Sequence, residues 1–501
     1  MNILLIYPRY PDTFWSFRYA LRFTFKKATH PPLGLLTIAS MLPNEWNKKL
    51  IDMNVTPLRK RDFKNIDLVF LSAMHVQKDS VLDVINLCKK FGVKIVAGGP
   101  MFTGSYEEFK DLIDYLVLNE AEITLPEFIK DFTNGKPKKI YKTDKFADIT
   151  KTPVPLWNLL DMKKYTSMAI QYSRGCPFNC EFCEVTSLFG HRVRTKTKEQ
   201  IVNELENLYQ AGWRGSVFFV DDNFIASKRK VKKEILPAII EWQEKRNYPF
   251  HFYTQVSINL ADDDELLTLM RKAKFTSVFV GIETPNEESL AEANKIQNIN
   301  RDLVESIRKI QKSGLEVMGG FILGFDSDPP SIFDSLIKFI EETRIITAMV
   351  GLLNAPPKSK LYKRLKKEGR ILPQFIGNNT DLSTNIIPKM DYQFLINGYK
   401  RVLRELYSSK NYYQRIKNYL KDFPIPDASK INWKFFKLHY GYLFAVFSSF
   451  WKFGIKDRDR FDFWKLIFST LKMKPKALSH VLAWIITGYH FRKIFKEAFV
   501  N

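Results

Sequence analysis

The sequence has little cysteine, little histidine and no long apolar segment. Only 4 of its 501 residues are cysteine and 7 are histidine. So few cysteines exclude the disulfide framework of small secreted proteins and favour a reducing compartment, so we expect a cytoplasmic protein. Residues 1–8 indicate a buried strand and not a signal peptide. The uncharged runs at 438–451 and 477–491 are shorter than the roughly 20 apolar residues of a membrane span.

Acidic residues are also scarce relative to basic ones. The chain carries 77 Lys and Arg against 54 Asp and Glu, a net charge of +23. Residues 391–501 hold 21 basic and 8 acidic residues and are rich in aromatics. A basic excess favours an anionic partner, either nucleic acid or an anionic membrane surface. Because this segment is helical by pattern, unusually apolar and contains no recognisable RNA-binding module, we expect no nucleic acid. Its helices either pack on the preceding domain or lie in the interface on the inner face of the membrane.

Residues 1–150 alternate strand patterns with helical ones. The predicted strands are 3–7, 68–72, 94–97 and 115–118. Val81, Val84, Ile85 and Cys88 form a helical stripe, so Cys88 is interpreted as a core residue and not a ligand. Strand–helix alternation predicts a doubly wound, Rossmann-like parallel sheet. Gly98 and Gly99 directly follow a strand, where glycine allows a ligand to approach the backbone closely.

Two further regions follow a proline-containing linker at 151–167. From 168 to 390, six strand–helix units predict a full or partial α/β barrel, with chemistry at the carboxyl ends of the strands. The strand segments are 169–173, 216–220, 250–254, 278–281, 320–323 and 348–352. Thr197 and Gln200 form a capping box that begins one of the helices. Residues 391–501 form a mainly helical C-terminal domain.

Three of the four cysteines lie just after the first barrel strand. Cys176, Cys180 and Cys183 are spaced C-x3-C-x2-C. A single loop with this spacing can bind three irons of a [4Fe–4S] cluster and leaves the fourth iron open to a small chelating molecule. The alternative is structural zinc, which needs four ligands and commonly uses a second Cys or His pair. The sequence offers no second pair, and the nearest histidine is His191.

The cysteine motif, with Phe182 before its last cysteine, resembles the radical S-adenosylmethionine (SAM) superfamily. The resemblance implies that the open iron chelates SAM and that one electron cleaves it to a 5′-deoxyadenosyl radical. It also implies SAM contacts at the ends of later strands, in the segments 220–224, 281–283 and 319–324. The expected contact residues are Asp221, Asp222, Glu283, Gly320 and Gly324.

An α/β domain before such a barrel resembles the cobalamin-binding class of radical SAM proteins. The segments 31–36 and 97–100 are typical of that class, which implies a cobalamin contact at Gly98 and Gly99. The D-x-H-x-x-G cobalt-ligand motif is missing, because neither His30 nor His75 lies two residues after an Asp. The cobalamin is therefore expected to be base-off, with no histidine ligand.

Motifs along the whole chain resemble the subfamily that includes the hopanoid C-2 methylase. They lie at 15–17, 30–34, 171–176, 219–224 and 488–492. The resemblance implies a C-methyltransferase that acts on an unactivated carbon of a hydrophobic, hopanoid-like or isoprenoid-like substrate. It implies an electron donor such as flavodoxin or ferredoxin. Two alternatives remain: a radical enzyme that cyclises or rearranges a lipid or tetrapyrrole, and a non-enzymatic iron–sulfur protein.

Overall fold

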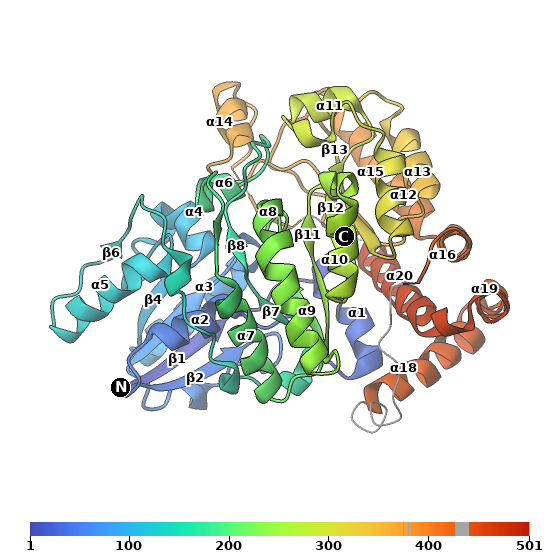
Figure 1. Cartoon of the computed structure of the whole chain (residues 1–501). Helices are drawn as coiled ribbons and strands as arrows, with labels where there is room; N and C mark the ends of the chain where they lie inside the picture. Colours follow the sequence, from blue (N-terminus) through green and yellow to red (C-terminus); the bar gives the residue numbers. More distant parts are fainter. Residues whose placement is uncertain (374, 379, 426–439, 500–501) are drawn as a thin grey trace.

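The structure is a computed structural model that describes residues 1–373, 375–378, 380–425 and 440–499. An N-terminal parallel sheet, a central strand–helix barrel and a group of C-terminal helices follow one another along the chain (Figure 1). This order confirms the predicted fold class. Residues 438 and 439 of the first uncharged run lie outside the described residues.

The N-terminal sheet has six parallel strands in the order β2-β1-β3-β4-β5-β6. Its strands are β1 (Asn2–Tyr7), β2 (Asn47–Asp52), β3 (Leu68–Ser72), β4 (Lys94–Gly98), β5 (Tyr115–Val117) and β6 (Ile140–Tyr141). Helices cover both faces: α2 (Leu33–Met41), α3 (Lys78–Phe91), α4 (Pro100–Phe109) and α5 (Ala121–Thr133). The four predicted strands are confirmed, whereas β2 and β6 were not predicted. The stripe of α3 is buried as predicted, and Cys88 is 0% exposed.

The barrel also has six parallel strands, in the order β14-β13-β12-β11-β10-β7. They are β7 (Ser167–Ile170), β10 (Gly215–Phe219), β11 (Phe250–Val256), β12 (Phe275–Glu283), β13 (Glu316–Leu323) and β14 (Ala348–Leu352). The outer helices are α7 (Lys198–Gln210), α9 (Leu236–Lys245), α10 (Asp264–Lys272), α12 (Leu303–Lys312) and α13 (Ile332–Thr343). The capping box of Thr197 and Gln200 begins α7, as predicted.

The barrel is open, because β7 and β14 do not pair with each other. The free edge of β7 is covered by the N-terminal segment, since Thr166 and Ser167 donate backbone N–H groups to the carbonyls of Ala28 and Thr29. The free edge of β14 is capped from α15 (Tyr392–Tyr407), where the Tyr407 hydroxyl bonds both backbone groups of Ala348. These contacts satisfy strand edges that would otherwise expose unpaired backbone groups.

The C-terminal helices differ in how deeply they are buried. They are α15, α16 (Ser409–Asp422), α18 (Tyr440–Ser449), α19 (Arg460–Met473) and α20 (Leu478–Ala498), with a π-helical turn η11 (Phe450–Lys456) after α18. The second uncharged run lies mostly in α20, which packs on the barrel: the Trp484 indole donates to Glu316 at 3.0 Å. In the described residues no helix is long and apolar enough to cross a membrane.

The first and last motifs of the subfamily resemblance meet in space. The His490 ring of α20 stacks on Phe17 with ring centroids 5.3 Å apart. Its Nε2 lies 3.2 Å from the carbonyl oxygens of Thr13 and Phe14. The N-terminal segment is therefore held between the barrel and α20, and segments nearly 500 residues apart form one packing unit.

Glu316 begins β13 at the amino end of the barrel strands. We predict that its carboxyl group makes the free energy of unfolding depend on pH. Burial raises its pKa to about 7. A carboxyl whose pKa is raised on folding stabilises the protein at low pH, and this contribution is lost as pH rises through the folded pKa. Glu316→Gln should therefore raise the free energy of unfolding at pH 8.5 by on the order of 1 kcal/mol, which raises the thermal midpoint there, and should change little at pH 5. An equal shift at both pH values, measured by circular dichroism, would contradict this.

Candidate functional site

Asp221 determines where the first barrel strand ends. Its carboxylate is 0% exposed and accepts the backbone N–H groups of Tyr172, at 3.0 Å, and of Ser173. These groups would otherwise continue the ladder between β7 and β10. The strand predicted at 169–173 therefore stops at Ile170, and residues 173–174 pair separately with residues 194–195. Asp221 thus positions the start of the cysteine loop, and both its oxygens are used in doing so.

The cysteine loop follows directly and brings three thiols to the carboxyl edge of the barrel. Gly175 opens the loop with a φ of +91°, and a side chain there would lie 2.6 Å from the Arg192 carbonyl oxygen. Cys176, Cys180 and Cys183 are all partly exposed and unpaired by disulfides. Burial raises the pKa of Cys183 to about 12 and also raises the pKa of Cys176. A metal that binds these thiols must therefore displace their protons.

The loop is held in place from two later elements. Arg364 of α14 (Lys360–Lys367) donates two hydrogen bonds to the Glu181 carboxylate, at 2.7 and 2.9 Å. The Asn294 side chain donates to the Asn179 carbonyl at 2.9 Å. The Gln297 amide lies 3.8 Å from the Cys180 sulfur, at the distance of a weak hydrogen bond. The loop therefore has a fixed conformation before any ligand binds.

Two charged side chains lie beside the thiols. The charges of Asp222 and Lys295 both act on Cys176 and Cys183. Burial, together with the neighbouring Asp221 carboxylate, raises the pKa of Asp222 to about 7. Burial lowers the pKa of Lys295, but the charges of Glu283 and Cys180 outweigh it, and the net shift is upward. A carboxyl and an ammonium group at one open edge suit a ligand that carries both charges.

Glu283 ends β12 in a strained conformation and pairs with Lys295. Its φ is +68°, which is rare for a residue other than glycine, asparagine or aspartate. Its Oε1 lies 2.6 Å from the Lys295 ammonium, and both side chains are largely buried. The pair folds over Gly281, where a side chain would lie 2.5 Å from the Glu283 carboxylate. Lys295 was not predicted from the sequence, because it lies in the irregular segment after α11 (Glu287–Glu292).

Of the two predicted glycines, Gly320 lies within β13 and Gly324 directly follows the carboxyl end of that strand. A side chain at Gly320 would lie 2.7 Å from the Phe279 ring. Gly324 has a φ of +101°, and its backbone N–H donates to Asp328 at 2.8 Å. Asp328 also accepts the Ser289 hydroxyl at 2.7 Å and so ties the end of β13 to α11.

The carboxyl edge of the N-terminal sheet carries the other two predicted glycines. A side chain at Gly98 would lie 2.6 Å from the Val117 carbonyl oxygen, and one at Gly99 would lie 2.5 Å from the Ser72 hydroxyl. Close packing between strand ends therefore already requires both glycines. A contact between these glycines and a cofactor would be a second role, independent of this packing.

Buried ion pairs join this edge to the cysteine loop. Arg174, two residues before Cys176, lies 2.7 Å from Glu122, and Arg194 lies 2.6 Å from Glu120. Burial raises the pKa of Glu122, but Arg174 outweighs burial and brings it down to about 2. The carboxyl edges of the two sheets therefore face each other. These four residues were not predicted from the sequence, although Arg174 lies within the cysteine motif.

Several buried polar atoms lack a hydrogen-bond partner where the two edges meet. Among the described residues none bonds the Nε2 of His75, the Oδ1 atoms of Asn119 and Asn179, the Oε1 of Glu184 or the Oε1 of Gln297. His75 and Asn119 follow strands of the N-terminal sheet, and the other three lie in or beside the cysteine loop. His75 and Glu184 approach within 3.8 Å. Buried polar groups without partners are costly, so these atoms suit a polar ligand bound between the edges.

The interior of the barrel is aromatic at mid-height. Side chains of β11 and β13 alternate between fully buried and partly exposed, and the partly exposed ones point inward. Phe218 stacks on Tyr253 with ring centroids 4.8 Å apart, and Trp15 of the N-terminal segment lies 5.4 Å from Phe279. The Tyr253 hydroxyl bonds His30 Nε2. Burial lowers the pKa of His30 to about 4, so this ring is neutral at physiological pH. An apolar molecule fits such a lining.

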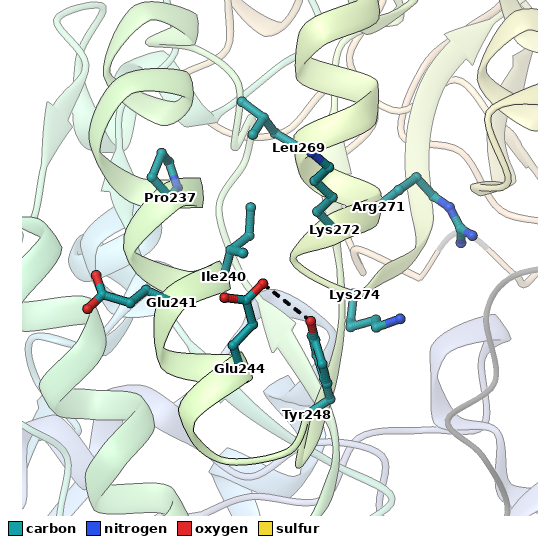
Figure 2. A pocket seen from close by; sticks show the side chains of 9 residues that line it. All are labelled: Pro237, Ile240, Glu241, Glu244, Tyr248, Leu269, Arg271, Lys272 and Lys274. Atoms are coloured by element: carbon teal, nitrogen blue, oxygen red, sulfur yellow. Dashed lines mark hydrogen bonds between the residues drawn. The ribbon is translucent and has the colours of Figure 1, made fainter.

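Figure 2 shows a different hollow, between α9 and α10 on the outside of the barrel. Tyr248 and Lys274 at its rim directly precede β11 and β12, so it lies at the amino ends of the strands. The cysteine loop lies at the opposite, carboxyl ends. The hollow therefore does not belong to the candidate site.

The cysteines present fit the [4Fe–4S] cluster that their spacing implies. Three thiols share one fixed loop, and Cys88 is buried in the core of the N-terminal domain. Within the described ranges, no three His, Cys, Asp or Glu side chains are grouped as ligands of a single metal ion. The thiols of a cubane cluster bind three different irons and so stand further apart than the ligands of one ion.

Three family models match successive parts of the chain. The B12 binding domain matches residues 26–129, the radical SAM superfamily matches residues 170–340, and a domain of unknown function, DUF4070, matches residues 359–500. Among solved structures, the cobalamin-dependent SAM radical enzyme OxsB with aqua-cobalamin bound has a TM-score of 0.62 at 16% identity, and the alignment covers 99% of this chain and 80% of that one. The fold and the site thus define a radical SAM protein with an N-terminal B12-binding domain.

Curated relatives give the family. An uncharacterized methyltransferase of Synechocystis sp. is 40% identical over 98% of this chain and 91% of its own length. The hopanoid C-2 methylase of Rhodopseudomonas palustris is 32% identical over 99% of this chain and 94% of its own length. The chain belongs to the cobalamin-binding radical SAM family of methyltransferases, in the subfamily that includes the hopanoid C-2 methylase.

The cysteines allow a test with a matched control. Cys180→Ala should reduce the iron bound after anaerobic reconstitution from about four per chain to about one or less, because one of three cluster thiolates is lost. Cys88→Ala, which removes the fourth cysteine, should keep the full iron content and the cluster absorption. Full iron content in Cys180→Ala would contradict the assignment of this loop.

The ion pair between Arg174 and Glu122 should be important for stability. Arg174→Ala leaves the buried Glu122 carboxylate unpaired, at a cost of about 3 kcal/mol. Because the folded pKa of Glu122 is depressed to about 2, the pair contributes above the unfolded pKa near 4.5 and its contribution disappears as pH falls toward 2. The thermal midpoint of Arg174→Ala should be well below that of the wild type at pH 7. The difference between the two thermal midpoints should be smaller at pH 4. An equal difference at both pH values would contradict this role of the ion pair.

Proposed function

We propose that this protein is a C-methyltransferase that uses a [4Fe–4S] cluster, SAM and base-off cobalamin to methylate an unactivated carbon of a hydrophobic, hopanoid-like or isoprenoid-like substrate. The observation that carries the proposal is the facing of two strand edges, one with three free thiols and one belonging to the B12-binding domain. The relatives named as methyltransferases support the same reaction class.

Cys176, Cys180 and Cys183 bind the cluster in this proposal. Asp222 and the Glu283–Lys295 pair contact the polar groups of SAM, and Gly320 and Gly324 leave room beside its adenine. Asp221 acts indirectly by positioning the loop. Gly98 and Gly99 border the cobalamin, and the partnerless atoms of His75 and Asn119 receive its polar groups. When bound, the cluster with SAM supplies a hydrogen-abstracting radical, and cobalamin supplies the methyl group.

In this proposal the protein itself positions the substrate and excludes water from it. The ion pairs of Arg174 and Arg194 fix the distance between the two edges, so that a substrate carbon between them is close to both cofactors. The aromatic interior below the edge excludes water from a reactive radical. The neutral His30 ring and the Tyr253 hydroxyl form a polar contact within this apolar lining.

The proposal extends to partners. The single electron comes from a small donor such as flavodoxin or ferredoxin, since radical SAM enzymes need a reductant. A hydrophobic substrate of this class resides in a membrane, so the enzyme works at the membrane surface, on its cytoplasmic face. The basic, aromatic C-terminal segment supports this location.

The alternative reaction is cyclisation or rearrangement of a lipid or tetrapyrrole by the same radical without methyl transfer. The anaerobic magnesium-protoporphyrin IX monomethyl ester cyclase of Synechocystis sp. is 25% identical over 65% of this chain. The 32% identity with a methylase over nearly the whole chain favours methyl transfer.

The products of SAM distinguish the two reactions. The reconstituted enzyme is incubated anaerobically with reductant, SAM, cobalamin and a hopanoid, and the products are quantified by mass spectrometry. Methyl transfer predicts S-adenosylhomocysteine and 5′-deoxyadenosine in equal amounts, both dependent on the hopanoid, together with a product heavier by one CH2. Deoxyadenosine without S-adenosylhomocysteine would contradict the proposal. Cys180→Ala should abolish both products, and Cys88→Ala should yield both.

A further inference from the structure

Exposed apolar side chains concentrate on one part of the C-terminal domain. Of the 22 large apolar side chains that are exposed in the described chain, nine lie between residues 443 and 471. These nine define what is called here the C-terminal apolar face: Leu443, Phe444, Val446, Phe447, Trp451, Ile455, Phe461, Phe468 and Leu471. Phe447 is the most exposed, at 74%. Such a cluster on a folded chain marks an interaction surface.

The face is built on two packed helical elements. Phe447, Trp451 and Ile455 recur every four residues along α18 and η11, so they lie on one side of that continuous segment. On α19, Phe461 and Phe468 are 67% and 63% exposed, whereas Phe463, Leu466 and Ile467 are buried. The Trp464 indole donates to the Gly454 carbonyl at 3.0 Å, and its ring stacks on Phe468 at 5.7 Å. The two elements are therefore fixed to each other.

Basic side chains are placed among these exposed rings. The Lys456 ammonium lies 5.2 Å from the centre of the Trp451 ring, and the Arg460 guanidinium lies 4.9 Å from that of Phe461. Residues 443–472 contain six Lys or Arg and three Asp. Long basic side chains can extend their charges to a polar boundary while their stems and the neighbouring rings stay in an apolar layer.

We infer that the C-terminal apolar face is a membrane-docking surface that inserts its rings at the level of anionic lipid head groups. The chemistry favours this occupant over a second copy of the chain, because a self-complementary contact would bring two basic faces together. Figure 1 shows α18 and α19 at the margin of the molecule, on the side away from the N-terminal sheet. The inference deepens the proposed function and rests on it only for the hydrophobic nature of the substrate.

One aromatic contact links this face to the segment that covers the open barrel. Phe25 is 60% exposed, and its ring lies 4.3 Å from that of Phe444. Phe25 belongs to the same N-terminal segment as Trp15, which contacts Phe279 inside the barrel. The docking surface is thus continuous with the segment that borders the aromatic interior, and a lipid-like substrate would enter beside it.

Vesicle sedimentation of the full-length, reconstituted protein tests the inference without substrate or SAM, so that a failed methylation assay does not affect the result. The vesicles are phosphatidylcholine alone and phosphatidylcholine mixed with phosphatidylglycerol. The wild type should pellet with the anionic vesicles and much less with the neutral ones. The double variant F447E/F468E should bind the anionic vesicles about tenfold more weakly. The control Phe394→Glu makes the same exchange at a 46% exposed residue on α15 and should bind normally.

A charge test separates lipid from other occupants. Lys456→Glu with Arg460→Glu should weaken anionic binding, and Lys90→Glu on α3 should not. Melting temperature and iron content must match the wild type in every variant. Wild-type protein that stays in the supernatant with both vesicles would overturn the inference, as would equal binding by F447E/F468E. A wild-type dimer that the same double variant converts to monomers would assign the face to self-association instead.

Discussion

The whole arrangement depends on two buried ion pairs that hold the carboxyl edge of one parallel sheet against that of another. Arg174 and Arg194 come from the short strands on either side of the cysteine loop. Glu120 precedes helix α5, and Glu122 lies in the first turn of that helix. Ligands of parallel sheets bind at the carboxyl ends of the strands. Two such edges that face each other therefore form a single site between them. These pairs are among the contacts that hold the cysteine loop next to the B12-binding domain.

The sequence predicts the parts of this arrangement that depend on local pattern. The stripe that ends at Cys88 follows helical periodicity, and the strands predicted in the barrel follow apolar runs, so their existence was predictable. Strand β2 was missed because its sequence, Asn-Lys-Lys-Leu-Ile-Asp, is mostly polar and gains its conformation by pairing with β1. Tertiary pairing overrides weak local preference in such a segment.

Long-range contacts explain what the sequence did not reveal in the site. Asp221 and Asp222 are adjacent and were expected to act alike, yet Asp221 bonds the backbone of residues 172–173, while Asp222 lies beside the thiols. Lys295 pairs with Glu283 although helix α11 lies between them in the sequence. The two uncharged C-terminal runs looked similar, but most apolar side chains of α20 are buried, whereas several of α18 are exposed. The hydropathy of a helix shows how apolar it is, but not which other elements will cover it.

The proposed docking surface and the proposed substrate site together suggest a route for an apolar molecule. A docking surface on α18 and α19 continues through Phe25 into the N-terminal segment, which borders an aromatic barrel interior. Above that interior lies the edge with the three thiols, opposite the B12-binding domain. In this proposal the three regions matched by separate family models follow one spatial order, from the C-terminal apolar face to the barrel interior and then to the facing strand edges.

The central claim is that the cysteine loop binds a cluster with one iron left open at the edge that faces the B12-binding domain. Mössbauer spectroscopy of enzyme reconstituted with 57Fe, recorded with and without SAM, tests this most directly. About one iron in four should change its isomer shift when SAM is added, because only that iron lacks a protein ligand. Spectra that SAM leaves unchanged would contradict it.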